Sequence, residues 1–185
     1  INSDDIYAPY AFEIVNQIFA DHPTVKWIQG NIVFYNELSQ IIQFVFPFKY
    51  RNRLIRCGAY GKGTLPYIQQ ESVFWRFELN KEINLTQLRN FKFAGDFYIW
   101  YSFSKKHELF IVWAYLSGFR THQNQLSQMK LKYREEYRSI CEKEKLIDYL
   151  LILIDKFIWS GPQNLKLKFN KNIIKYNKKK KSYTF

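Results

Sequence analysis

Apolar residues recur at helical spacing from Pro9 onward, and the pattern stops before Pro23. This stretch predicts an amphipathic helix, with a proline at the position where a first helical turn begins. Residues 25–35 are rich in β-branched and aromatic side chains and predict one or two strands. The apolar run at 109–115 predicts a buried strand.

The other segments carry weaker patterns. Residues 41–67 mix aromatic side chains with arginines and glycines and predict an irregular stretch with short strands. We expect a short helix over 71–79, a clearer helix over 97–106, and one or two helices over 125–159. Residues 165–169 alternate apolar side chains with lysines, which favours a short edge strand before a basic tail. This order of elements predicts an α/β domain.

The net charge of +12 is concentrated at one end of the chain. Residues 165–185 contain eight lysines and no acidic residue, so the rest of the chain carries only +4. A nucleic-acid-binding surface more often spreads Lys and Arg along a folded face with aromatic side chains between them. We therefore expect no nucleic-acid partner, with binding through the basic tail as the competing hypothesis.

The two cysteines, Cys57 and Cys141, form no CxxC motif and have no histidine at ligand spacing beside them. Neither a disulfide framework nor a zinc site is indicated, and a reducing compartment is favoured. No stretch offers the ~20 apolar residues that a membrane-spanning helix needs, and the first residues do not resemble a secretory signal. We expect a cytoplasmic protein that works at the inner face of a membrane or free of it.

Two carboxylates stand side by side at Asp4 and Asp5, directly before the first predicted helix. Adjacent carboxylates can hold a hard divalent cation such as Mg²⁺ or Mn²⁺ together with the oxygens of a diphosphate. The alternative is that one of them caps the helix that follows.

Residues 68–76 bring amide, carboxylate, indole and guanidinium groups into nine positions. Trp75 could stack against a sugar face, and Gln70 or Glu71 could bind hydroxyl groups. Arg76 could pair with a phosphate. The alternative is an amphipathic core helix that contains a salt bridge.

Two further segments hold single groups that can do chemistry. Asp96 follows Gly95 and precedes aromatic residues as far as Trp100, which would partly desolvate its carboxyl group and raise its proton affinity, as a general base requires. The competing role for Asp96 is a helix N-cap. Arg120 and His122 follow the predicted strand at 109–115, where an imidazole near an acidic site could complete a coordination shell.

Four segments together resemble the C-terminal half of family 2 glycosyltransferases with the GT-A fold. They are NSDDIYAPYAFE, IQQESVFWR, AGDFYIW and GFRTHQNQLS, and the resemblance covers residues 1–133. It implies that Asp4 and Asp5 hold a divalent cation and the nucleotide diphosphate, with Asp5 the direct ligand. It implies that Asp96 is the catalytic base and that His122 contacts the metal or the diphosphate. The pocket for donor and acceptor would be lined by Gln70, Glu71, Trp75, Arg76, Gly95, Trp100 and Arg120.

The chain departs from the family pattern at three points. Asn2 stands where many relatives have Asp, and Gly95 stands where Glu is common. The βαβ units that bind the nucleotide base in this family would precede Ile1. We therefore expect a C-terminal portion of the domain at 1–133, a helical segment at 134–164 and a basic tail at 165–185, with little activity in this chain alone.

The resemblance predicts an inverting, metal-dependent transfer of a sugar from a nucleotide-sugar donor to a saccharide or lipid-linked acceptor, in polysaccharide or glycoconjugate biosynthesis. The alternative is a non-catalytic half-domain that uses residues 146–185 to bind an anionic membrane surface or a partner. Residues 146–159 combine an apolar stripe with Asp148 and Asp155, and the lysines that follow would attract anionic lipids.

Overall fold

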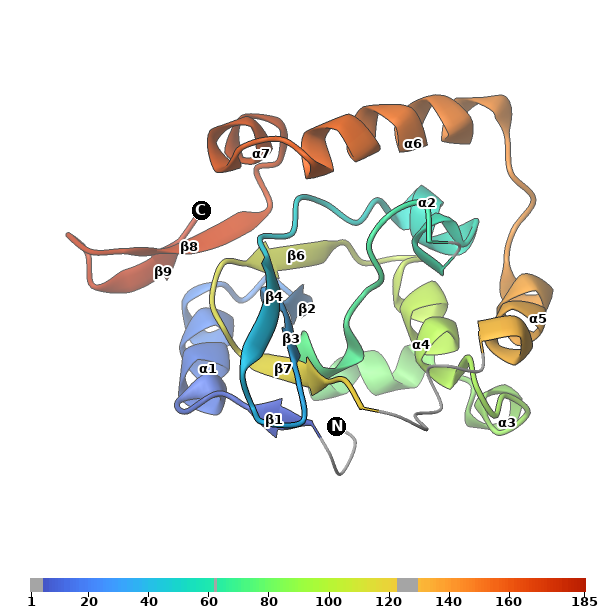
Figure 1. The fold of residues 1–185 in the computed structure, drawn as a ribbon, viewed down its shortest axis with the longest axis horizontal. Helices are drawn as coiled ribbons and strands as arrows, with labels where there is room; N and C mark the ends of the chain where they lie inside the picture. The colour runs from blue at the N-terminus through green and yellow to red at the C-terminus, as the bar shows by residue number, and fades with distance from the viewer. Residues whose placement is uncertain (1–4, 62, 123–129) are drawn as a thin grey trace.

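A computed structural model describes residues 5–61, 63–122 and 130–185, and within them the chain is a mixed α/β protein with two mixed sheets (Figure 1). The smaller sheet has the order β1-β7-β3-β4, in which β3 and β7 run parallel and the other pairs run antiparallel. Its strands are β1 (Ile6–Tyr7), β3 (Ile32–Tyr35), β4 (Ile41–Val45) and β7 (Ser117–Arg120).

The larger sheet has the order β5-β2-β6-β8-β9. Strand β6 runs parallel to both of its neighbours, β2 and β8. The two outer pairs, β5–β2 and β8–β9, are antiparallel. The strands are β2 (Trp27–Gln29), β5 (Val73–Trp75), β6 (Leu109–Val112), β8 (Ile173–Asn177) and β9 (Ser182–Thr184).

Helices cover the sheets, with α1 at one side, α4 and α5 at the other, and α6 and α7 across one end (Figure 1). The α-helices are α1 (Ala11–Asp21), α2 (Asn52–Arg56), α3 (Leu85–Leu88), α4 (Gly95–Phe103), α5 (Lys130–Ile140), α6 (Leu146–Trp159) and α7 (Gln163–Phe169). Short 3-10 turns are η1 (Ala59–Gly61), η2 (Gln70–Ser72) and η3 (Phe77–Glu82). In the described part of the chain, no helix is long and apolar enough to cross a bilayer.

Segments with strong periodicity fold as predicted. The first amphipathic helix is α1, the strands expected at 25–35 are β2 and β3, and the apolar run at 109–115 contains β6. The helix expected at 97–106 is α4, and the long segment after it contains the separate helices α5 and α6.

Two predictions about local structure are wrong. Residues 71–79 contain strand β5 between two 3-10 turns instead of a helix, because Trp75 pairs with Trp27 across the β5–β2 ladder. Residues 165–169 belong to helix α7 instead of an edge strand. The rest of the expected basic tail forms the β8–β9 hairpin, since Ile173 and Ile174 are buried beside β6 while the hairpin lysines stay exposed.

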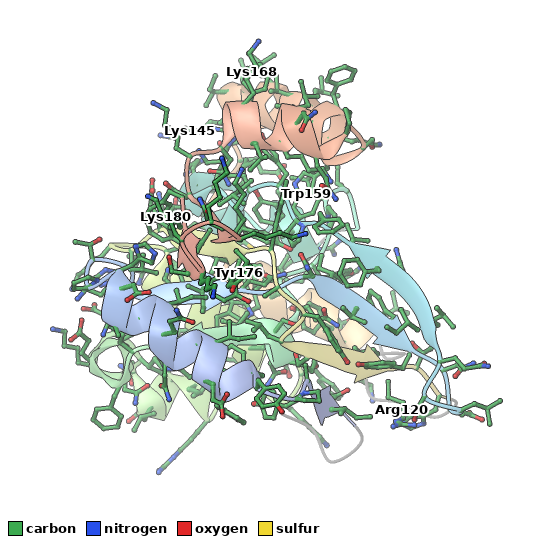
Figure 2. All side chains as sticks on the ribbon, turned by 90° about the vertical axis from the view of Figure 1, so that its left-hand side faces the viewer. Arg120, Lys145, Trp159, Lys168, Tyr176 and Lys180 are labelled. Carbon is green, nitrogen blue, oxygen red and sulfur yellow. The ribbon has the colours of Figure 1, made fainter. Side chains whose placement is uncertain are left out.

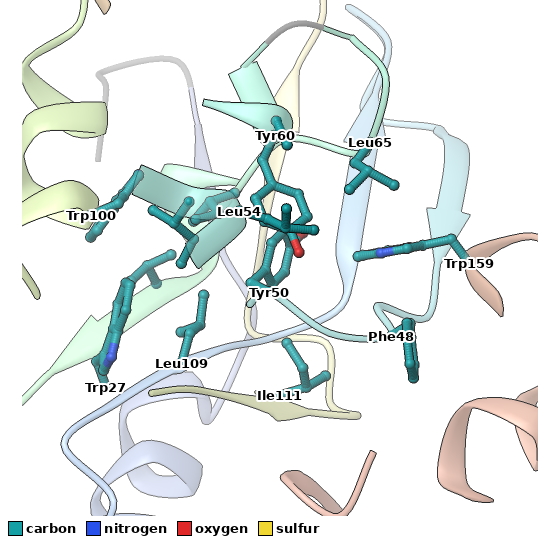
Figure 3. Packing of buried hydrophobic residues seen from close by; sticks show 14 of the residues in the cluster. Trp27, Phe48, Tyr50, Leu54, Tyr60, Leu65, Trp100, Leu109, Ile111 and Trp159 are labelled. Carbon is teal, nitrogen blue, oxygen red and sulfur yellow. The ribbon is translucent and has the colours of Figure 1, made fainter. Parts of the chain in front are cut away.

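The largest core cluster lies between the larger sheet, α2, α4 and α6 (Figure 3). Aromatic rings dominate it: Trp27 stacks on Trp100 with ring centroids 5.8 Å apart, and Tyr50 meets Trp159 edge-on at 5.4 Å. Such pairs add to the free energy gained from burying their area. A second cluster packs α1 against Ile28, Val112 and Leu116.

Two ion pairs attach α6 to the rest of the molecule. Asp148 and Asp155 stand on the inward face of α6, and both side chains are fully buried. Arg53 Nη2 lies 2.7 Å from Asp148 Oδ2, and Arg51 Nη2 lies 2.8 Å from Asp155 Oδ1. The hydrogen bonds from Arg53 hold the pKa of Asp148 below its ordinary value. Removing one partner from such a pair leaves an uncompensated charge in the protein interior.

Replacing Asp155 with Ala should lower the free energy of unfolding by about 3 kcal/mol, because the Arg51 guanidinium then loses its partner in a site mostly shielded from water. Urea denaturation measures this. Glu78→Ala, which removes the exposed Lys26–Glu78 ion pair, is the matched control and should have little effect. Equal midpoints for the two variants would show that the Arg51–Asp155 pair does not anchor α6.

Candidate functional site

Strand pairing brings Asp5 to the end of β7. Strand β1 is antiparallel to β7, with Ile6 opposite Gly118, so that Asp5 lies at the end of β7 that Phe119 and Arg120 form. The backbone N–H of Arg120 donates a hydrogen bond to Asp5 Oδ1 at 3.1 Å. A side chain at Gly118 would collide with the Tyr35 ring, so the close approach of β7 to β3 depends on this glycine.

Glu71 is placed at the same end by its neighbours in η2. The Gln69 side chain accepts from Val33 N at 3.0 Å and donates to Val33 O at 2.8 Å, which ties the turn to β3. The Ser72 hydroxyl lies 2.9 Å from the Ser117 hydroxyl, which ties the turn to β7. Glu71, held between these two bonds, is only 5% exposed.

The charge of Asp5 acts on Glu71. Burial is the main cause that raises the pKa of Glu71 to about 7, and the charge of Asp5 raises it further. A buried carboxyl group beside a second negative charge keeps its proton to a higher pH than an isolated one. Burial, followed by the charges of Glu71 and Asp5, also raises the pKa of Tyr7, which lies on β1 two residues after Asp5.

Asp96 is the third acidic group of this site. It is the second residue of α4, and its Oδ1 is buried with no hydrogen-bond partner among the described residues. Burial raises the pKa of Asp96 to about 6, against the opposing effect of the Phe97 N–H and its own N–H. The charge of Asp96 makes the smallest contribution to the raised pKa of Glu71, and we call Asp5, Glu71 and Asp96 together the acidic cluster.

Asp96 also lines a small depression whose free space is about 10 Å³, roughly enough for one water molecule. Aromatic rings from four segments make up much of its wall, together with short apolar side chains. The aromatic lining residues are Tyr60, Tyr67, Phe97, Trp100 and Tyr133. Burial and the charge of Asp96 raise the pKa of Tyr133, whose side chain lines the same depression as that carboxyl group. An acid with raised proton affinity in an aromatic-lined depression is a feature of many binding and catalytic sites.

The predicted site residues in segment 70–76 divide between two places. Glu71 belongs to the acidic cluster, and Gln70 is exposed at the start of η2. Trp75 packs against Trp100 with ring centroids 5.9 Å apart, and its Nε1 donates to Asn80 Oδ1 at 2.9 Å. Arg76 lies elsewhere: it donates to the carbonyl oxygens of Phe19, His22 and Val25 at the end of α1. Its guanidinium therefore stabilises the helix terminus.

The remaining predicted residues lie around the cluster. Gly95 is the first residue of α4, and the Arg120 side chain donates to Glu37 O at 3.1 Å. His122 is half-buried two residues after β7, close in sequence to the Arg120 N–H that binds Asp5. Asp4 lies outside the described residues. Within the described ranges, no group of three or more His, Cys, Asp or Glu side chains has the geometry to hold a metal ion.

Sequence reasoning overlooked the tyrosines of the depression and the role of Gln69. Tyr133 stands in a polar, lysine-rich stretch, and only its spacing of four residues from Tyr137 indicates a buried helix face. Tyr67 and Tyr60 come from the irregular region after α2, where no periodicity identifies them.

No protein-family model matches this chain, and no curated protein is significantly similar to it. Its function is therefore inferred from the acidic cluster, the aromatic depression and the resemblance of the four sequence segments.

Replacing Glu71 with Gln should make the protein less sensitive to pH. A carboxyl group whose folded pKa is raised stabilises the fold below its ordinary pKa of 4.5 and loses that contribution as pH rises through the folded value of about 7. Between pH 5 and 7.5, the variant should gain roughly 2 kcal/mol of unfolding free energy relative to the wild type.

Urea denaturation at a series of pH values measures this difference. Glu135→Gln on the exposed side of α5 changes the charge equally without touching the cluster, and is the matched control. A Glu71→Gln profile parallel to that of the wild type would mean that Glu71 titrates as an ordinary carboxylate.

Proposed function

We propose that this chain is the catalytic, acceptor-side part of a glycosyltransferase with the GT-A fold. It transfers a sugar from a nucleotide-sugar donor to an acceptor hydroxyl with inversion. The observation that carries the proposal is the acidic cluster, of which Asp96 lines the aromatic depression. These residues belong to three of the four segments on which the resemblance rests, and they are up to 91 positions apart along the chain.

In this proposal Asp96 is the general base. Its pKa of about 6 leaves the carboxylate mostly ionised at neutral pH, yet with a higher proton affinity than an ordinary aspartate. It takes the proton of the acceptor hydroxyl while the acceptor oxygen bonds to the anomeric carbon. The bond from that carbon to the diphosphate breaks in the same displacement, and the nucleoside diphosphate leaves with the bonding electrons.

The rim of the depression offers contacts for an acceptor, because its free space of about 10 Å³ admits a hydroxyl group rather than a sugar ring. Tyr67 is 46% exposed and lies in the same wall as Asp96, so its ring is available to a ligand. Aromatic rings with a polar end offer an apolar face and a hydrogen-bonding group together, which suits a saccharide. Trp100 is only 2% exposed and forms the floor of the depression. The tyrosines are therefore the residues that would contact an acceptor directly.

The resemblance also implies a divalent cation at Asp4 and Asp5, which would offset charge on the leaving diphosphate. Asp5 fits this role in part, since it is a carboxylate beside a second carboxylate, Glu71. The described residues supply only part of a ligand set. The requirement for Mg²⁺ or Mn²⁺ and the cytoplasmic location stay predictions. In this proposal the chain's own side chains remove the proton of the acceptor and position the acceptor.

Asp96→Asn should lower turnover at least about 100-fold, because the amide has nearly the same shape as the carboxylate but cannot accept the acceptor's proton. The assay follows sugar transfer from a panel of nucleotide sugars, using the longest form of the protein that its gene encodes. Residual turnover within about tenfold of the wild type would rule out Asp96 as the base.

Asp21→Asn, at the exposed end of α1, is the matched control and should leave turnover unchanged. A second readout separates chemistry from folding: wild-type kcat/KM should fall as pH drops below about 6, where Asp96 becomes protonated.

A further inference from the structure

Helix α6 exposes an apolar face to solvent. One stripe along the helix consists of Leu146, Leu150, Leu153 and Phe157, flanked by Ile147 and Ile154, and we call these six residues the α6 face. Leu146 is 90% exposed and Phe157 is 75% exposed. Single exposed apolar residues are ordinary, but a continuous stripe along a 14-residue helix indicates a surface that contacts something else.

The orientation of α6 is imposed by its ion pairs. A surface helix usually turns its charged side chains to water and its apolar stripe to the core. Helix α6 does bury Ile152, Ile158 and Trp159. It also turns Asp148 and Asp155 inward to Arg53 and Arg51, so two charged side chains take inward positions and a second apolar stripe faces solvent. Rotating the helix to bury the α6 face would expose or separate these buried pairs, so the apolar stripe stays outside.

Positive charge surrounds the α6 face. Lys143 and Lys145 are exposed before the helix, Lys156 is exposed on it, and Lys168 is exposed on α7. Figure 2 shows Lys145 and Lys168 at the end of the molecule that α6 and α7 form.

The acidic groups of this region are engaged by side chains of the protein. Asp148 and Asp155 bind arginines, and Glu142 binds Arg53 and Arg56. Glu144 accepts a hydrogen bond from the Tyr149 hydroxyl at 2.6 Å. The exposed charges beside the apolar stripe are therefore mainly those of lysines.

We propose that the α6 face and its flanking lysines bind the surface of an anionic lipid bilayer, with α6 lying in the plane of the interface. An exposed apolar stripe bordered by lysines matches the acyl-chain boundary and the anionic headgroups together. A second copy of the chain fits less well, because pairing two α6 faces would bring lysines against lysines.

This contact leaves the candidate site accessible. Helices α6 and α7 lie at the opposite end of the molecule from β1 and β7, which carry Asp5 and its hydrogen-bond partner (Figure 1). The proposal does not depend on sugar transfer, since it uses none of the residues of the acidic cluster.

Cosedimentation with vesicles tests it. The protein should bind vesicles that contain phosphatidylglycerol and bind pure phosphatidylcholine vesicles much more weakly. The double variant Leu153→Asp, Phe157→Asp should lower the partition coefficient about tenfold or more, because both side chains would insert into the interface. Leu38→Asp, at a residue 79% exposed in the β3–β4 turn, is the matched control and should bind like the wild type.

Charge is tested separately with Lys156→Gln and Lys168→Gln, each of which should weaken binding to the anionic vesicles about fivefold. Circular dichroism establishes that the variants remain folded. Vesicle binding that is the same in all variants would overturn the proposal. So would a dimer in sedimentation velocity that the Leu153→Asp, Phe157→Asp pair abolishes, in a protein that does not bind vesicles.

Discussion

The electrostatic interaction between the carboxyl groups of Asp5 and Glu71 is the interaction on which the candidate site depends. It requires that two acidic groups from distant segments share a buried place and that one of them keeps its proton near neutral pH. The backbone supplies this arrangement through the β1–β7 pairing on one side and the Gln69 and Ser72 hydrogen bonds on the other. Asp96 then meets the pair from the start of α4, with its own proton affinity raised by burial.

The protein handles buried charge differently at its two ends. At the α6 end, each buried carboxylate has an arginine partner, and Asp148 titrates below its ordinary pKa. In the acidic cluster the neighbours of Glu71 are other carboxylates, and its pKa is raised. Paired charges of the first kind hold elements together, whereas groups of the second kind exchange protons near neutral pH and suit acid–base chemistry.

The sequence predicted α1, β6 and α4 because their own residues carry the pattern. The sequence prediction failed at 71–79, because the strand there forms by pairing with β2 some 46 positions away. It also failed at 165–185, because the many lysines of this stretch obscure the pattern of the two buried isoleucines of β8. For the site, the sequence predicted separate roles for Asp5 as a metal ligand, Glu71 as a hydroxyl-binding residue and Asp96 as a base, and these roles stay predictions. The burial of Glu71, the hydrogen bonds of Arg76 to the end of α1 and the position of Tyr133 follow from tertiary packing, which residue types alone do not encode.

The most direct measurement of the central claim is an NMR titration of the side-chain carboxyl carbons in the wild type and in Asp5→Asn. Glu71 should titrate near pH 7 in the wild type and at a lower pH in the variant, because the negative charge of Asp5 is then gone. A Glu71 pKa near the ordinary value of 4.5, unchanged by Asp5→Asn, would contradict the existence of the acidic cluster.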